Sequence, residues 1–120
     1  VVFIGETPHD RFGRSVDTAG DVNGDGFDDV IIGAFLNDRG GIESGTAYLF
    51  FGGSLSGWVY ASEADAIFRG EEECDMSAMP VAHAGDTNRD GYADFLNGAI
   101  YNDRGGDESG AAYLFLGMPD

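Results

Sequence analysis

The feature of this sequence that most limits its possible folds is an internal repeat with a period of 65 residues. Two long segments align at this offset without a gap: Gly20–Asp29 corresponds to Gly85–Asp94, and Asn37–Phe50 corresponds to Asn102–Phe115. A chain made of two copies of one unit is predicted to fold as two similar modules that pack on each other, because repeated units bury their apolar faces against their neighbours.

Each unit is predicted to consist of short β-strands separated by turns rich in glycine and aspartate. In the first copy, alternating or β-branched runs predict strands at 15–19, 30–34 and 46–51. Two further runs, at 58–60 and 66–68, are candidates for a fourth, outer strand. No segment has a helical period of useful length. An all-β fold is therefore expected, with two β-propeller blades of four antiparallel strands.

The repeat also predicts how the chain is divided. We expect one repeat at residues 1–54, with Val1–Ile4 as an outer strand, and a second repeat at residues 55–120. Because a propeller closes with about four to eight blades, two blades are expected to be part of a larger propeller or of one completed by other copies. The second copy has three predicted strands, so Val1–Ile4 of the same chain or of another copy is a candidate for its fourth.

The most distinctive part of the unit is an acidic loop that occurs twice at the same spacing. Each loop has aspartate at positions 1, 5 and 9 and asparagine at position 3, and the main-chain carbonyl of position 7 adds a fifth oxygen. Oxygen ligands suit Ca²⁺, whereas transition metals prefer the imidazole or thiolate groups that the loops lack. The predicted ligands of the two calcium sites are Asp21, Asn23, Asp25, Phe27 and Asp29 in the first copy and Asp86, Asn88, Asp90, Tyr92 and Asp94 in the second.

The acidic loops have two alternative interpretations. An EF-hand begins with a similar loop but carries a bidentate Glu at position 12, followed by a helix. Position 12 is Ile32 in one copy and Asn97 in the other, which excludes an EF-hand. The second alternative is that the aspartates only stabilise turns by accepting main-chain hydrogen bonds. It leaves three like charges in one turn, where they repel each other unless a cation intervenes.

Three motifs of the first copy, Phe12–Gly13, D-x-N-x-D-G-x-x-D at residues 21–29 and Gly33–Ala34, resemble the FG-GAP repeat. This repeat is found in the seven-bladed β-propeller of integrin α subunits and in many secreted bacterial proteins. The resemblance covers essentially the whole chain as two repeats. It implies that each acidic loop joins the first two strands of a blade and binds Ca²⁺ through the residues named above.

The second copy departs from the FG-GAP pattern at several positions. Ser77–Ala78 stands where the first copy has Phe12–Gly13, and the polar residue Asn97 lies within a predicted strand. Inside the acidic loop, Arg89 replaces Gly24. Because Arg89 places a positive charge close to the expected cation, the second site is predicted to bind Ca²⁺ more weakly than the first.

The charge of the chain excludes some classes of function. It has 22 acidic and 6 basic residues, a net charge of -16 and no lysine, so it lacks the basic surface that nucleic acid or an anionic membrane requires. No apolar run approaches the roughly 20 residues of a membrane span. The N-terminus has none of the features of a signal peptide, so any such peptide is expected to have been removed. An extracellular or cell-surface location is expected, because Ca²⁺ is plentiful there.

The function predicted from these features is a calcium-stabilised extracellular structural or adhesion module. Its expected partners are further propeller blades or copies of itself, with an extracellular protein or glycan as a further candidate. One alternative is a homo-oligomeric filament or ring assembled by strand donation, and another is an accessory domain of a secreted hydrolase. No catalytic residues are predicted, because His9 and His83 have no Ser, Cys or Asp partner at motif spacing and acidic pairs such as Glu71–Glu72 have no fixed separation.

Two other sets of equivalent residues are predicted to be structural. Arg39 and Arg104 are expected to hold their turns by hydrogen bonds to acidic neighbours, such as Asp38 and Asp103. Aromatic residues that alternate on the third strand of each copy are expected to pack between the blades. They are Tyr48, Phe50, Tyr113 and Phe115.

Overall fold

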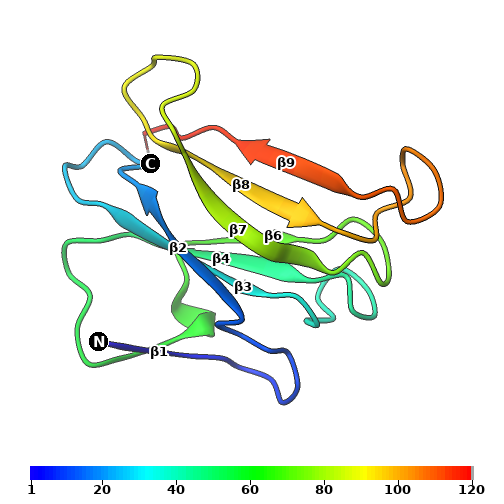
Figure 1. The fold of residues 1–120 in the computed structure, drawn as a ribbon. Coiled ribbons are helices and arrows are strands. Elements are labelled where there is room, and N and C mark those ends of the chain that lie inside the picture. Colours follow the sequence, from blue (N-terminus) through cyan, green and yellow to red (C-terminus); the bar gives the residue numbers. More distant parts are fainter. Residues whose placement is uncertain (120) are drawn as a thin grey trace.

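A computed structural model describes residues 1–119 as an all-β structure with two main sheets, and Figure 1 shows one sheet lying over the other. The first sheet has the order β2 (Ser15–Gly20), β3 (Asp29–Ala34), β4 (Thr46–Phe50) and β6 (Ala66–Arg69). The second has the order β7 (Ser77–Gly85), β8 (Asp94–Ala99) and β9 (Ala111–Phe115). All neighbouring strands in both sheets are antiparallel, which confirms the predicted propeller blades.

The two sheets are equivalent at the period of the repeat. In the first blade Ile31 pairs with Leu49, and in the second blade Leu96 pairs with Leu114, 65 residues further along in both strands. The acidic loops connect β2 to β3 and β7 to β8. They therefore join the first two strands of each blade, as the resemblance implied.

The outer strand of the first blade is β6, which pairs with β4. The other candidate, now β5 (Trp58–Tyr60), is not part of this sheet and pairs in parallel with β1 (Val2–Ile4). A short 3₁₀ helix, η1 (Ala61–Glu63), separates β5 from β6. Within residues 1–119 the second sheet has three strands, and no helix is long and apolar enough to cross a membrane.

Strand β1 lies against the first blade much as β6 lies against the second. The ring centroids of Phe3 and Phe50 are 4.9 Å apart, and those of the equivalent residues Phe68 and Phe115 are 4.5 Å apart. The strand that pairs with β1 here is β5, however, and not the third strand of a further blade. The assignment of Val1–Ile4 as the outer strand of another blade, with the boundaries at 54 and 55, remains a prediction.

The main core lies between the two blades, where β7 packs on β2 and β3. Phe95 of the second blade is buried there and stacks on Phe115, while Phe68 of the first blade contacts both rings. Tyr48 and Phe50, which were also expected between the blades, pack instead in a separate cluster against Phe12 and Phe3, whereas Phe115 lies in this core as expected. The other buried members of this core are Ala19, Val22, Ile31, Ala47, Leu49, Ala78 and Val81.

The same face is covered on the first blade and open on the second. Ile31 and Leu49 are 0% and 3% exposed, because the second blade packs on them. Their equivalents Leu96 and Leu114 are 36% and 47% exposed. An apolar face of this kind is expected where a further blade packs, so the pair of blades is part of a larger propeller.

The polar residue Asn97 is accommodated in strand β8 by a main-chain partner. Its side chain is buried, and its Oδ1 accepts a hydrogen bond from the N–H of Ala78. The amide therefore has a partner inside the core, which a buried polar group requires.

Candidate metal centre

The backbone of the two acidic loops has the left-handed residues that a sharp turn requires. In the first loop Gly24 and Gly26 have φ values of 77° and 91°, and in the second loop Gly91 also has a φ of 91°. Arg89, at the position of Gly24, has a φ of 60°. A side chain in this conformation costs about 1 kcal/mol relative to glycine, so the second loop is the more strained of the two.

The aspartates at positions 1 and 5 of the first loop hold the turn by hydrogen bonds. Asp21 accepts from the main-chain N–H groups of Gly24, Asp25 and Gly26 at 2.7 to 3.0 Å. Asp25 in turn accepts from the N–H of Phe27 at 2.9 Å. These are the Asx-turn bonds that the second alternative interpretation expects. They account for the shape of the loop without a cation.

The third aspartate, Asp29, joins the loop to the end of β4. It is buried at the start of β3, where it accepts from the N–H of Val22 at 2.8 Å and from the N–H of Gly52 at 2.9 Å. Burial raises the pKa of Asp29, and the negative charges of Asp25 and Asp21 raise it further, while the two N–H bonds oppose these effects. The carboxylates of the first loop are thus close enough to repel one another.

The second loop repeats this arrangement. The main-chain N–H groups of Asp90 and Gly91 donate to Asp86, and that of Tyr92 donates to Asp90. Asp94 accepts from the N–H groups of Thr87 and Gly117. Burial raises the pKa of Asp94, but the bonds from Thr87 and Gly117 outweigh this effect and hold the pKa below its usual value. The asparagines also match, since Asn23 donates to Asp25 and Asn88 donates to Asp90.

The types of oxygen ligand present in each loop suit a hard divalent cation. They are carboxylate, amide and main-chain oxygens, which are the ligands of Ca²⁺. As the side chains stand, no three His, Cys, Asp or Glu residues in the described part of the chain are arranged to hold a metal ion. A carboxylate oxygen that accepts one N–H bond retains a further lone pair. Binding therefore requires the side chains to draw together, and the ligand sets remain predictions.

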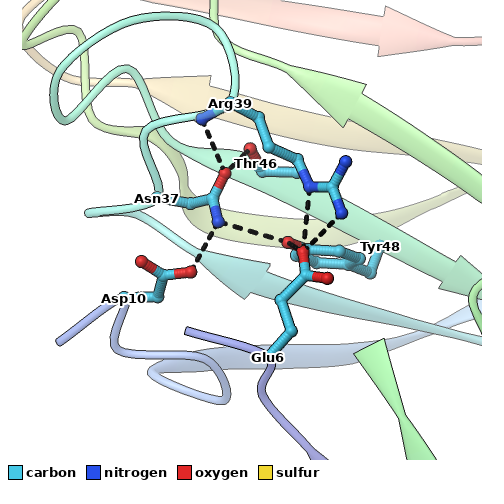
Figure 2. Close-up of polar contacts among 6 residues, drawn as sticks. All are labelled: Glu6, Asp10, Asn37, Arg39, Thr46 and Tyr48. Carbon is cyan, nitrogen blue, oxygen red and sulfur yellow. Dashed lines mark hydrogen bonds and ion pairs between the residues drawn. The ribbon is translucent and has the colours of Figure 1, made fainter. Parts of the chain in front are cut away.

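A buried polar network that the sequence analysis did not predict lies beyond the other end of β3. Figure 2 shows Asn37 at its centre, with its Nδ2 donating to Asp10 at 2.5 Å and to the Tyr48 hydroxyl at 3.3 Å. Oδ1 of Asn37 accepts from the Thr46 hydroxyl and from the N–H of Arg39. Asn37 is buried and both ends of its amide are used, so it connects the segment before β2 to the turn between β3 and β4.

Glu6 completes this network. It accepts from Nε of Arg39 and from the hydroxyl of Tyr48, each at 2.9 Å. Arg39 was expected to bond to an acidic neighbour such as Asp38, but its partner is 33 residues away in the sequence. The carboxylate of Asp38 instead accepts from the N–H of Glu43 within the turn. Desolvation acts to raise the pKa of Glu6, but the bonds from Arg39 and Tyr48 lower it below its usual value.

The second copy has an equivalent network without the threonine, because Ala111 stands at the position of Thr46. Its members, in the same order along the chain, are Glu71, Asp75, Asn102, Arg104 and Tyr113. All five recur at the period of 65, which was a signal that they act together. What the repeat does not show is which of these residues touch, because the glutamate and the arginine come from segments far apart in the chain.

The network predicts how stability depends on alkaline pH. Burial, together with the hydrogen bond to Glu6, raises the pKa of Tyr48 from 10.0 to about 12. The stabilisation from this protonated hydroxyl is complete below pH 10 and is lost as the pH rises to about 12. Urea unfolding measures this loss. Between pH 10 and 12 we expect the free energy of unfolding to fall by about 2 kcal/mol more for the wild type than for Tyr48→Phe. If the free energy of unfolding falls equally with pH in both proteins, this prediction is wrong.

Comparison with known proteins agrees with the fold. Residues 12–50 match the FG-GAP repeat family. The chain is 35% identical to integrin alpha-5 of Xenopus laevis over 122 residues, an alignment that covers 98% of this chain and 11% of that protein. It is 33% identical to integrin alpha-8 of Mus musculus, with the same two coverages. It is 35% identical to integrin alpha-PS2 of Drosophila melanogaster over 90% of this chain and 8% of that protein.

These similarities extend over nearly the whole chain and so include both repeats. The chain spans about a tenth of the length of the curated relatives it matches. The comparisons also support the prediction that the chain is not an enzyme.

Proposed function

We propose that this chain, in which residues 12–50 match the FG-GAP repeat family and nearly all residues align with part of integrin α chains, serves as a calcium-stabilised structural or adhesion module outside the cell. The observation that carries the proposal is the duplicated acidic loop, in which the aspartates at positions 1 and 5 accept equivalent main-chain hydrogen bonds in both blades. A turn alone does not need three carboxylates, which repel each other, whereas a calcium site uses them as ligands.

In this proposal, Asp21, Asn23, Asp25 and Asp29, with the main-chain oxygen of Phe27, hold the first ion, and their equivalents hold the second. Bound Ca²⁺ supplies positive charge that offsets the repulsion within each loop. Asp29 already connects its loop to Gly52 at the end of β4, so a loop fixed by the ion also fixes that end of the blade. The metal thus has a structural role in the blade.

The proposed partners follow from the surfaces of the two blades. The open face around Leu96 and Leu114 is expected to pack against a further propeller blade, as the equivalent face of the first blade does. An extracellular protein or glycan that binds the finished propeller is a second proposed class of partner. The location outside the cell is proposed from the similarity to integrin α chains.

Calcium titration of the purified chain tests this function. We expect two binding events by calorimetry and a rise in Tm, since a ligand at one hundred times its Kd adds about 2.7 kcal/mol to the free energy of unfolding. Asp25→Ala should remove the tighter event and Asp90→Ala the weaker one, because of Arg89. Glu72→Ala, which removes an exposed carboxylate outside the loops, is the control. A chain that shows neither heat of binding nor a change in Tm would refute the proposal.

A further inference from the structure

The two acidic loops are in direct contact. The N–H of Ala93 in the second loop donates to the main-chain oxygen of Asp21 in the first, at 2.9 Å. The ring of Tyr92 lies over Gly24, where a Cβ would overlap the ring and stand 3.0 Å from its Cδ1. The second repeat therefore touches the first loop at position 1, which is a predicted ligand, and at position 4, which lies between two others.

We infer that Tyr92 is a positioning residue for the first calcium loop, so that the first site is built by both repeats. This inference rests on the calcium-binding function proposed above. Gly24 is flanked by Asn23 and Asp25, and its left-handed conformation sets the direction in which both side chains leave the backbone. The Tyr92 ring packs on Gly24 and limits its movement, while Ala93 holds the main chain of Asp21.

Tyr92 thereby has two separate roles in the two loops. Its side chain acts on the first loop, while its main-chain oxygen is a predicted ligand of the second. The position equivalent to Gly24 in the second loop is Arg89, which is exposed, so the second loop has no such cover within residues 1–119. Phe27, the equivalent of Tyr92, is 55% exposed. The first loop is therefore better ordered for binding than the second, in addition to the effect of the Arg89 charge.

The test uses Asp90→Asn as the parent protein. This change removes a charged ligand from the second site but keeps a side-chain oxygen that can accept from the N–H of Tyr92. Calcium binding at the first site is then measured by calorimetry for Tyr92→Ala and Tyr92→Phe in this parent. Both variants keep the main-chain carbonyl at position 92, and Tyr92→Phe also keeps the ring.

We expect Tyr92→Ala to weaken Ca²⁺ binding at the first site about tenfold, as the loss of supporting contacts around a metal site does. Tyr92→Phe should bind within about twofold of the parent, because the contact with Gly24 is made by the ring. If Tyr92→Ala binds as tightly as the parent, or if Tyr92→Phe is weakened equally, the inference is wrong.

Amide hydrogen exchange of the metal-free proteins separates this inference from the proposed function. In Tyr92→Ala the N–H groups of Gly24, Asp25 and Gly26 should exchange at least about threefold faster, because their bonds to Asp21 open more often. Unchanged exchange in β8 would show that the fold is intact. If the parent protein binds no Ca²⁺, the proposed function is wrong. If amide exchange in the first loop is the same in Tyr92→Ala as in the parent, the role of Tyr92 is wrong, whether or not the parent binds Ca²⁺.

Discussion

Replacing Gly45 with alanine is expected to destabilise the chain by about 4 kcal/mol, whereas the same change at Gly110 is expected to cost about 1 kcal/mol. The two glycines are equivalent in the repeat, with φ values of 83° and 84°, so the strain of a left-handed alanine is the same. Their surroundings differ. A Cβ at Gly45 would stand 2.5 Å from the main-chain nitrogen of Ser77 and overlap its carbonyl, but at Gly110 the nearest atom, the oxygen of Ile100, is 3.3 Å away.

The additional cost at Gly45 comes from contacts between the two repeats. The N–H of Ser77 donates to the oxygen of Ser44, and the N–H of Gly70 donates to the oxygen of Gly45, at 2.8 and 2.7 Å. A side chain at position 45 pushes these segments apart. Urea unfolding of the two variants measures the difference. Equal losses at Gly45 and Gly110 would show that conformational strain, and not contact between blades, decides the cost.

The second large effect is expected for Asn37→Ala, at about 3 kcal/mol. The change removes the amide that donates to the buried carboxylate of Asp10 and to Tyr48, and it leaves the hydroxyl of Thr46 without its acceptor. A buried carboxylate that loses its donor costs more than the lost bond alone. Thermal and urea unfolding both report this loss.

Arg39→Ala is the control for Asn37→Ala. It breaks the ion pair with Glu6 in the same network, but both side chains are partly exposed, so the loss should stay below about 1 kcal/mol. If Arg39→Ala costs as much as Asn37→Ala, the ion pair and not the buried amide carries the network. Asn102→Ala tests the second copy, where Asn102 is buried and donates to Asp75 and Tyr113.

The sequence was informative where the signal was local or repeated. The run Val30–Ala34 is rich in β-branched residues and is followed by a glycine-rich turn, so β3 could be predicted from its own residues. The run at residues 58–60 likewise indicated a strand, β5. It did not indicate which strand β5 pairs with, because strand propensity is a property of the residues themselves. Its partner, β1, lies more than 50 residues earlier in the chain, so the pairing is a contact between distant segments.

Contacts between distant segments were the part that sequence alone could not supply. Glu6 and Arg39 each have several charged residues nearby in the sequence, and only the fold brings these two together. The same holds for Tyr92 and Gly24, which meet because the two blades pack side by side. For the metal loops, the repeat predicted the conformation of both turns, while their ligands remain to be tested by calcium binding.

Because neighbouring segments pack more closely on the first blade than on the second, equivalent substitutions in the two repeats are expected to differ in their effects. Equivalent positions have the same local conformation, yet the tolerance of each is decided by the neighbouring repeat. Gly24 lies under the Tyr92 ring and leaves no space for a side chain, whereas position 89 has the same turn and accommodates an arginine. A variant at one repeat is therefore a poor guide to the same variant at the next, unless the residues that cover both positions are compared first.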